Sequence, residues 1–223
     1  MCYPSAVRTL SLVAVSVMLS GASGCRPQGT VDPTILEAER EGAWSIYEAL
    51  ELRVASGSVS DADRLAALEK LRVAEDDHTA AYAYARAAVA GRVAELRGLK
   101  ALKILEEMRT WSLESIARDP GFEDMAAQRM LGTLYVLAGD HLDAGDSEDG
   151  LELLEAVVDS FPDRADNQLR LAEAYIALGD PDPGIEPLCL AALGRAALSG
   201  EEQILLASLL EELGGQDSLC IAL

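Results

Sequence analysis

Histidines and clustered carboxylates are the residues of this chain that could do catalytic or metal chemistry. The two histidines, His78 and His141, lie far apart in the sequence. The segment EDDHTA (75–80) places acids beside His78. Asp76 or Asp77 is better explained as the cap of a following helix, whose positive end favours an acid. This segment therefore predicts a helix start rather than a set of metal ligands.

A second acid-rich stretch, DHLDAGDSEDG (140–150), has the composition of a calcium loop. Gly145 stands where such a loop needs an acid or Asn two residues after Asp143, so the calcium pattern fails. The sequence contains no Ser–His–Asp motif, Gly-rich phosphate loop or nucleophile elbow, and no CxxC or His-rich spacing. The chain is therefore predicted to be a non-enzyme, without catalytic residues, cofactor or metal.

The remaining candidate surface lies in AAYAYARAAVAGRVAELRGLKALK (80–103), where Tyr82, Tyr84, Arg86 and Arg92 stand among alanines. Tyr82 and Arg86 are four residues apart, so they share a helix face. On a concave surface these side chains could recognise an acidic or aromatic group of a partner or ligand. The alternative is that Tyr82 packs between helices while Arg86 pairs with a neighbouring acid.

The elements that position these residues are predicted to be helices. Ala, Leu and Glu dominate, apolar residues recur every three or four positions, and strand-like alternation is missing. The fold class is therefore all-α. Glycines after the apolar segments and Ser, Asp or Pro before them mark about nine helices: 33–56, 60–75, 77–97, 99–118, 123–138, 148–160, 164–178, 183–197 and 200–213.

Three segments align with one another: MLGTLYVLAGD (130–140), RLAEAYIALGD (170–180) and LLASLLEELGG (205–215). Each has a Leu, a small residue, a Tyr or Leu and a Gly in the same order, and extra residues in 141–150 lengthen the first interval. The pattern resembles the tetratricopeptide repeat, a helix pair of ~34 residues. It predicts that 33–223 forms a right-handed superhelix of such pairs with a concave face. A bare helical bundle is the competing fold.

The N-terminal region has the layout of a secretory signal. LSLVAVSVML (10–19) is uncharged but shorter than the roughly 20 apolar residues that span a bilayer. It ends in ASGC (22–25), which resembles the bacterial lipobox, with Ala22 where Leu is commonest. We therefore expect a signal peptide over 1–24. The alternative is ordinary cleavage after SGA (20–22), which would release a soluble protein.

The lipobox predicts that Cys25 is lipidated and anchors the protein to a membrane that it does not span. Residues 25–32 would then form a short tether. Arg26 follows, rather than the Asp that marks inner-membrane retention in some bacteria. This favours the periplasmic side of the outer membrane.

Charge and cysteine usage agree with this location. Lys and Arg total 18 against 38 Asp and Glu, a formal net charge of −20, which argues against nucleic acid as a partner. Cys2 is lost with the leader and Cys25 is used for lipidation. Cys189 and Cys220 remain and could form a disulfide in an oxidising compartment. Two buried unpaired thiols are the alternative.

The leader, the Ala-, Tyr- and Arg-rich helix, and the segments 119–140, 143–155 and 167–180 together resemble the TatT-type component of TRAP transporters, over roughly 75–220. The resemblance implies a lipid-anchored periplasmic repeat protein that docks a substrate-binding protein, with a hydrophobic or carboxylate-bearing ligand passing between them. The sequence also leaves open whether the protein forms a homo-oligomer. The alternative function is a scaffold lipoprotein for envelope or outer-membrane assembly, with another envelope protein as partner.

Overall fold

The fold is an arc of helices. The computed structural model describes residues 29–97, 101–215 and 219–220, so the leader and Cys25 lie outside the described residues. Over the described part every regular element is helical, which confirms the predicted fold class. The described residues form ten α-helices: α1 (Pro33–Ala38), α2 (Ala43–Ala55), α3 (Asp61–Val73), α4 (Ala80–Arg97), α5 (Leu102–Arg118), α6 (Ala126–Ala138), α7 (Ser147–Ser160), α8 (Ala165–Ala177), α9 (Ile185–Leu193) and α10 (Gly200–Glu212).

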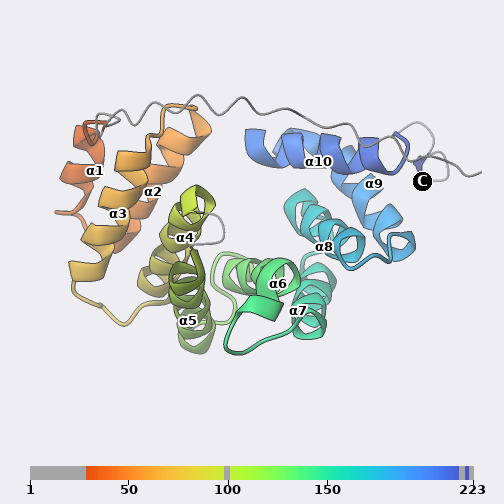
Figure 1. The fold of residues 1–223 in the computed structure, drawn as a ribbon, viewed down its shortest axis with the longest axis horizontal. Coiled ribbons are helices and arrows are strands. Elements are labelled where there is room, and N and C mark those ends of the chain that lie inside the picture. Colours follow the sequence, from red (N-terminus) through yellow and green to blue (C-terminus); the bar gives the residue numbers. More distant parts are fainter. Residues whose placement is uncertain (1–28, 98–100, 216–218, 221–223) are drawn as a thin grey trace, which may run out of the picture.

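Consecutive helices pack as pairs. The most extensive contacts lie within α4/α5, α6/α7 and α8/α9, as tetratricopeptide-like units require. Figure 1 shows α1–α3 at one end of the arc and α9 and α10 at the other, with α4–α8 between them. The structure is therefore an all-helical stack of sequential pairs. The right-handed sense of its superhelix stays a prediction.

Small residues set the spacing within two of these pairs. A Cβ on Gly150 of α7 would lie 2.8 Å from both the Gly132 carbonyl oxygen and the Tyr135 Cβ of α6. A Cβ on Gly184, just before α9, would meet the corresponding atoms of α8, the Tyr175 Cβ at 3.1 Å and the Ala172 oxygen at 3.2 Å. The two pairs thus make the same close approach. Gly150 follows Gly132 by eighteen residues and Gly184 follows Ala172 by twelve, so the extra residues lie between α6 and α7.

The predicted helix 33–56 was wrong in one respect, because it is two helices. Gly42 has φ +109°, a conformation outside the right-handed helical region, and the chain turns over 39–42 before α2 begins. The predicted helix 183–197 likewise ends early: α9 stops at Leu193, and a 3₁₀ turn follows at Arg195–Ala197. Gly194 connects the two. A Cβ at this position would come within 2.6 Å of the Ala165 Cβ, so a larger residue would not fit without movement of α8.

A third departure lies between α5 and α6, where a helix was predicted from 123. Glu123, Asp124 and Met125 instead have φ of +47°, +54° and +63°. Three consecutive non-glycine residues in the left-handed region are rare, because each Cβ crowds the following carbonyl group. This left-handed turn places Phe122 against Trp44 of α2, with ring centroids 5.5 Å apart.

The start of α3 is held by a buried carboxylate. Asp63 is 1% exposed and forms a capping box with Ser60. Its Oδ1 accepts the backbone N–H of Asp32 at 2.7 Å, and its Oδ2 accepts the Ser60 N–H at 2.9 Å and Arg53 Nε at 3.1 Å. Arg53 also bonds Asp32 at 2.6 Å. One acid therefore ties together the starts of α1 and α3 and the end of α2.

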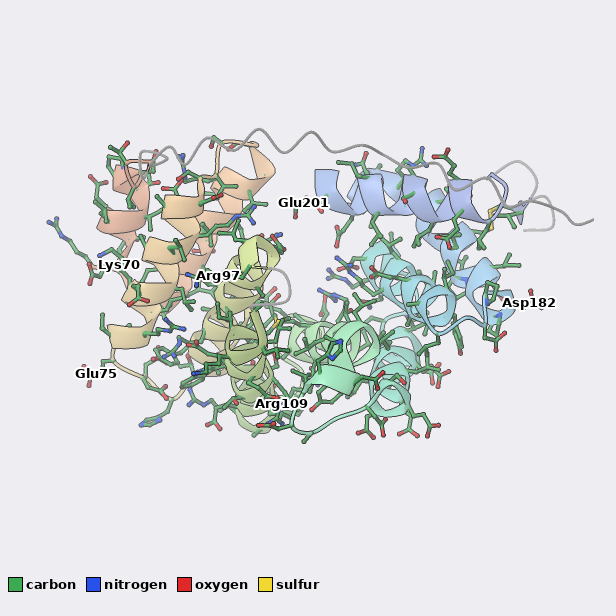
Figure 2. All side chains as sticks on the ribbon, in the orientation of Figure 1. Lys70, Glu75, Arg97, Arg109, Asp182 and Glu201 are labelled. Atoms are coloured by element: carbon green, nitrogen blue, oxygen red, sulfur yellow. A yellow bond between two sulfur atoms is a disulfide. The ribbon has the colours of Figure 1, made fainter. Side chains whose placement is uncertain are left out.

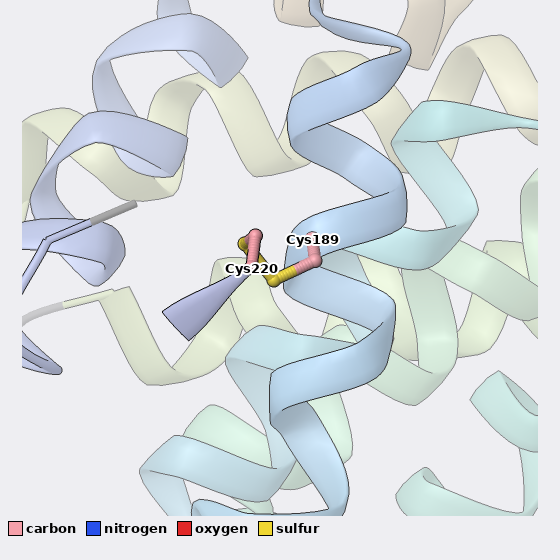
Figure 3. Close-up of a disulfide and its surroundings, with 2 residues drawn as sticks. All are labelled: Cys189 and Cys220. Carbon is pink, nitrogen blue, oxygen red and sulfur yellow. A yellow bond between two sulfur atoms is a disulfide. The ribbon is translucent and has the colours of Figure 1, made fainter. Parts of the chain in front are cut away.

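The last described residues are joined to α9. Cys189 of α9 and Cys220 form a disulfide with a Cα–Cα distance of 5.5 Å (Figure 3). Cys189 is buried, and an apolar cluster built from α8, α9 and α10, with Leu188, Leu206 and Leu210, extends to Leu219. The bond therefore fastens the chain after α10 back onto the preceding helix pair.

Candidate protein-binding groove

The two faces of α4 separate the four residues predicted to form a binding surface. Residues two positions apart on a helix point about 200° apart, so Tyr82 and Tyr84 face opposite ways. Tyr84 and Arg92, eight residues apart, lie on the concave side of the arc and line a groove there. Whether this pair binds a partner stays a prediction.

Tyr82 and Arg86 lie on the other face, so their prediction as a binding surface is corrected. Their exposed fractions are 3% and 8%. Arg86 bonds Glu107 at 2.8 Å and lies 4.5 Å from the ring centroid of Trp111, while the Tyr82 hydroxyl donates to the Ala74 carbonyl group at 3.1 Å. A packed Tyr82 and an Arg86 paired with an acid are the alternative that the sequence left open. The two residues join α3, α4 and α5.

The closed groove, as we name it, runs along the inside of the arc. It has a volume of about 500 Å³ and is lined by residues of α2, α4, α5, α6 and α8 and by the start of α10. Such a volume lies in the range typical of binding pockets. Its apolar wall includes Leu105, Met108, Met130, Leu134 and Leu137.

Arg92 closes one side of the groove. Its Nε and one terminal nitrogen bond both oxygens of Glu51 at 2.8 and 2.7 Å, and the other terminal nitrogen bonds Glu201 of α10 at 2.7 Å. Glu201 is 109 residues away in sequence, and Figure 2 shows it at the end of α10 that faces α2 and α4. Burial alone would lower the pKa of Arg92, but its bonds to Glu51 and Glu201 raise it. Arg92 therefore stays charged and bridges the two ends of the arc.

Beside the closed groove lies a second hollow, the aromatic pocket, of about 630 Å³. Trp44 and Tyr47 from α2 and Tyr84 from α4 line it, and Phe122 packs against Trp44 and Tyr84 with ring centroids 5.5 and 5.8 Å away. Tyr47 and Tyr84 meet edge to face at 5.5 Å. Burial raises the pKa of both phenols, so both stay neutral at physiological pH.

Sequence reasoning assigned no role to the α2 side of this surface. Trp44, Tyr47, Glu48 and Glu51 all line the aromatic pocket. Their spacing of three, four and seven residues is the signature of one helix face, which could have shown that these residues act together.

The acid-rich segments lie outside both hollows. Asp76 bonds Arg118 through two 2.8 Å contacts, and this pairing lowers the pKa of Asp76 to about 2. The start of α4 is capped by Thr79, whose hydroxyl accepts the Tyr82 N–H at 3.1 Å. His78 and His141 are both exposed. Within the described residues no cluster of His, Cys, Asp and Glu has an arrangement that could hold a metal ion.

A comparison with protein families finds a tetratricopeptide repeat over residues 141–186, which covers α7, α8 and the start of α9. No curated protein matches the chain. No helix in the described part of the chain has both the length and the hydropathy that a membrane span needs. The matched family binds other proteins and is typically non-catalytic, so this segment indicates a protein-interaction role.

Proposed function

We propose that the chain is a lipid-anchored periplasmic protein that binds, without catalysis, a partner of a TRAP-type solute uptake system. The closed groove is the observation that carries the binding part. It combines an apolar wall with the aromatic ring of Tyr84 and with charged groups at its edge. Protein interfaces typically combine an apolar and aromatic core with a polar rim in this way. The predicted leader over 1–24, directly followed by Cys25, supports the anchor, and the resemblance over 75–220 supports the TRAP assignment.

Partner capture tests the binding part. Leu137 lines the groove and is 53% exposed, so Leu137→Arg places a charge in the groove without disturbing the core. Leu193 of α9 is 74% exposed and lies outside the groove lining, so Leu193→Arg is the matched control. From envelopes solubilised in mild detergent, the tagged wild type and the control should co-purify with a TRAP substrate-binding protein. Leu137→Arg should retain less than about a tenth of the substrate-binding protein that the wild type captures, because an unpaired charge in an apolar contact is costly.

The identity of the captured protein separates the two candidate functions. A substrate-binding protein that Leu137→Arg loses supports the uptake proposal. Recovery of secretin or outer-membrane assembly components in its place would favour the scaffold alternative. Equal capture by Leu137→Arg and Leu193→Arg would show that the groove does not bind the partner in either function.

The anchor is tested separately with Cys25→Ser. Without its thiol the chain cannot receive the lipid, and a protein held only by acyl chains should then move from the membrane fraction to the soluble periplasm. Fractionation followed by immunoblotting measures this shift, with Cys220→Ser as the control that keeps Cys25. Retention of Cys25→Ser in membranes would contradict lipidation as the means of attachment.

A further inference from the structure

The aromatic pocket has a charge pattern of its own. Two arginines line it, but Arg129 bonds Asp166 and Asn167, and Arg164 bonds Asp124 and Asp166. Glu51 is likewise neutralised by Arg92. Within the described residues, Glu48 and Glu123 line the same pocket and form no ion pair. After pairing, two carboxylates therefore remain beside three aromatic rings.

The left-handed turn fixes the backbone of one of these two residues, Glu123. Glu123 has φ +47° and is the first of the three left-handed residues, directly after Phe122. Its neighbour Asp124 is fixed by Arg164 at 2.7 Å, and Phe122 by the rings of Trp44 and Tyr84. Strained backbone of this kind persists where the surrounding contacts over-determine it, and it is frequent at binding sites.

We propose that the aromatic pocket binds a basic side chain of a partner protein, with arginine favoured; this rests on the proposed function and specifies the chemistry of the partner. A cation is attracted to the faces of Trp and Tyr rings and to nearby carboxylates. The planar guanidinium group stacks on aromatic faces and is more weakly hydrated than the ammonium group of Lys. The chain's formal charge of −20 also steers a basic segment towards it.

The two hollows are arranged to take one extended chain. Tyr47, Glu51, Tyr84, Ala126 and Arg129 line both the closed groove and the aromatic pocket, so the hollows adjoin. A partner segment that lies in the closed groove can therefore deliver a side chain into the aromatic pocket. This continuity favours the side chain of a protein over a free cationic solute.

The test uses the two tryptophans of the full chain as reporters. With ¹⁵N-labelled tryptophan, the indole N–H signal of Trp44, assigned with Trp44→Phe, reports on the pocket. Trp111 stacks on Arg86 and does not line the aromatic pocket, so its signal is the internal control. Acetyl-Gly-Gly-Arg-Gly-Gly-amide should shift the Trp44 signal saturably and leave Trp111 in place. The citrulline peptide, which has the same shape but no charge, should bind at least about tenfold more weakly.

A matched pair of double variants separates the pocket from the general charge. Glu48→Gln with Glu123→Gln should weaken arginine binding about tenfold or more, since it removes the two unpaired carboxylates. Glu152→Gln with Glu186→Gln changes the net charge equally at exposed positions of α7 and α9 and should bind as the wild type does. Equal binding of the citrulline peptide, or equal loss in both double variants, would overturn the proposal. Circular dichroism checks that all variants are folded.

Methylguanidinium ion tests the choice of a protein partner. It lacks the peptide backbone that would lie in the closed groove, so it should bind at least about threefold more weakly than the arginine peptide. Equal affinity would reassign the pocket to a small cationic solute. If the arginine peptide fails to bind while partner capture is intact, this inference alone is overturned. If Leu137→Arg captures the partner as well as Leu193→Arg does, the proposed function of the groove is overturned.

Discussion

Asp63→Ala is expected to lower the free energy of unfolding by about 4 kcal/mol, because it leaves a partly buried Arg53 without one of its acids. It also removes the acceptor of two backbone N–H groups, those of Asp32 and Ser60. Each such donor left without a partner costs about 1–3 kcal/mol. Urea unfolding followed by circular dichroism measures the change.

Asp61→Ala provides the matched control for Asp63. Asp61 is exposed in the first turn of the same helix and makes only a dipole contribution, so its loss should cost about 0.5 kcal/mol. Equal losses in the two variants would show that the helix dipole, rather than the buried network, carries the effect.

The same residue gives a pH dependence whose sign follows from its pKa. Burial alone would raise the pKa of Asp63, but hydrogen bonds from Asp32, Ser60 and Arg53 outweigh it and hold the pKa below its usual value. The ionised carboxylate therefore stabilises the fold fully above the unfolded-state pKa of about 3.9. This contribution is lost as the pH falls through the lower, folded-state pKa. Below about pH 4 the wild type should lose stability more steeply than Asp63→Ala.

Gly150→Ala is the second large effect, with an expected loss in the free energy of unfolding of up to about 2 kcal/mol. The new Cβ would lie 2.8 Å from the Gly132 carbonyl oxygen, the Tyr135 Cβ and the Val136 backbone nitrogen. Two of these three atoms belong to the backbone of α6, so the helices must move apart. Overpacking of this kind costs about 1–3 kcal/mol, partly offset because Ala favours a helix over Gly by about 1 kcal/mol.

Gly200→Ala makes the same chemical change at an open position. A Cβ on Gly200, in the first turn of α10, meets no atom within 4 Å, so this variant should be neutral or more stable by up to about 1 kcal/mol. Thermal and urea unfolding of both variants provide the comparison. If Gly150→Ala were as stable as Gly200→Ala, close approach would not set the spacing of α6 and α7.

The helical content and the repeat register could be predicted because they depend on local pattern. The small residues Gly132 and Ala172 occupy equivalent positions in the sequence and in the helix pairs. Apolar periodicity located nearly every helix, with ends a few residues off. The break before α2 was missed because Gly42 follows charged residues that fit a helix equally well, and only its φ of +109° reveals the turn.

The candidate site could be predicted only in part, because it depends on which helices meet. Arg92 was singled out as a basic residue in an acidic chain, yet its partners Glu51 and Glu201 come from distant helices, and no local pattern connects them. Tyr82 and Tyr84 look equivalent in the sequence. Only the positions of α3 and α5 decide that Tyr82 is covered while Tyr84 faces the groove.

The contact between Arg92 and Glu201 also affects how the stack comes apart. In a simple array each unit touches only its neighbours, so terminal units fray independently of the other end. Here α10 is held on one side by apolar packing, which salt does not screen. On the other side it is held by an ion pair whose carboxylate, that of Glu201, is 52% exposed and is therefore screened by salt. A rise in ionic strength should therefore widen the closed groove at the Arg92–Glu201 contact more than it weakens the packing of the helix pairs.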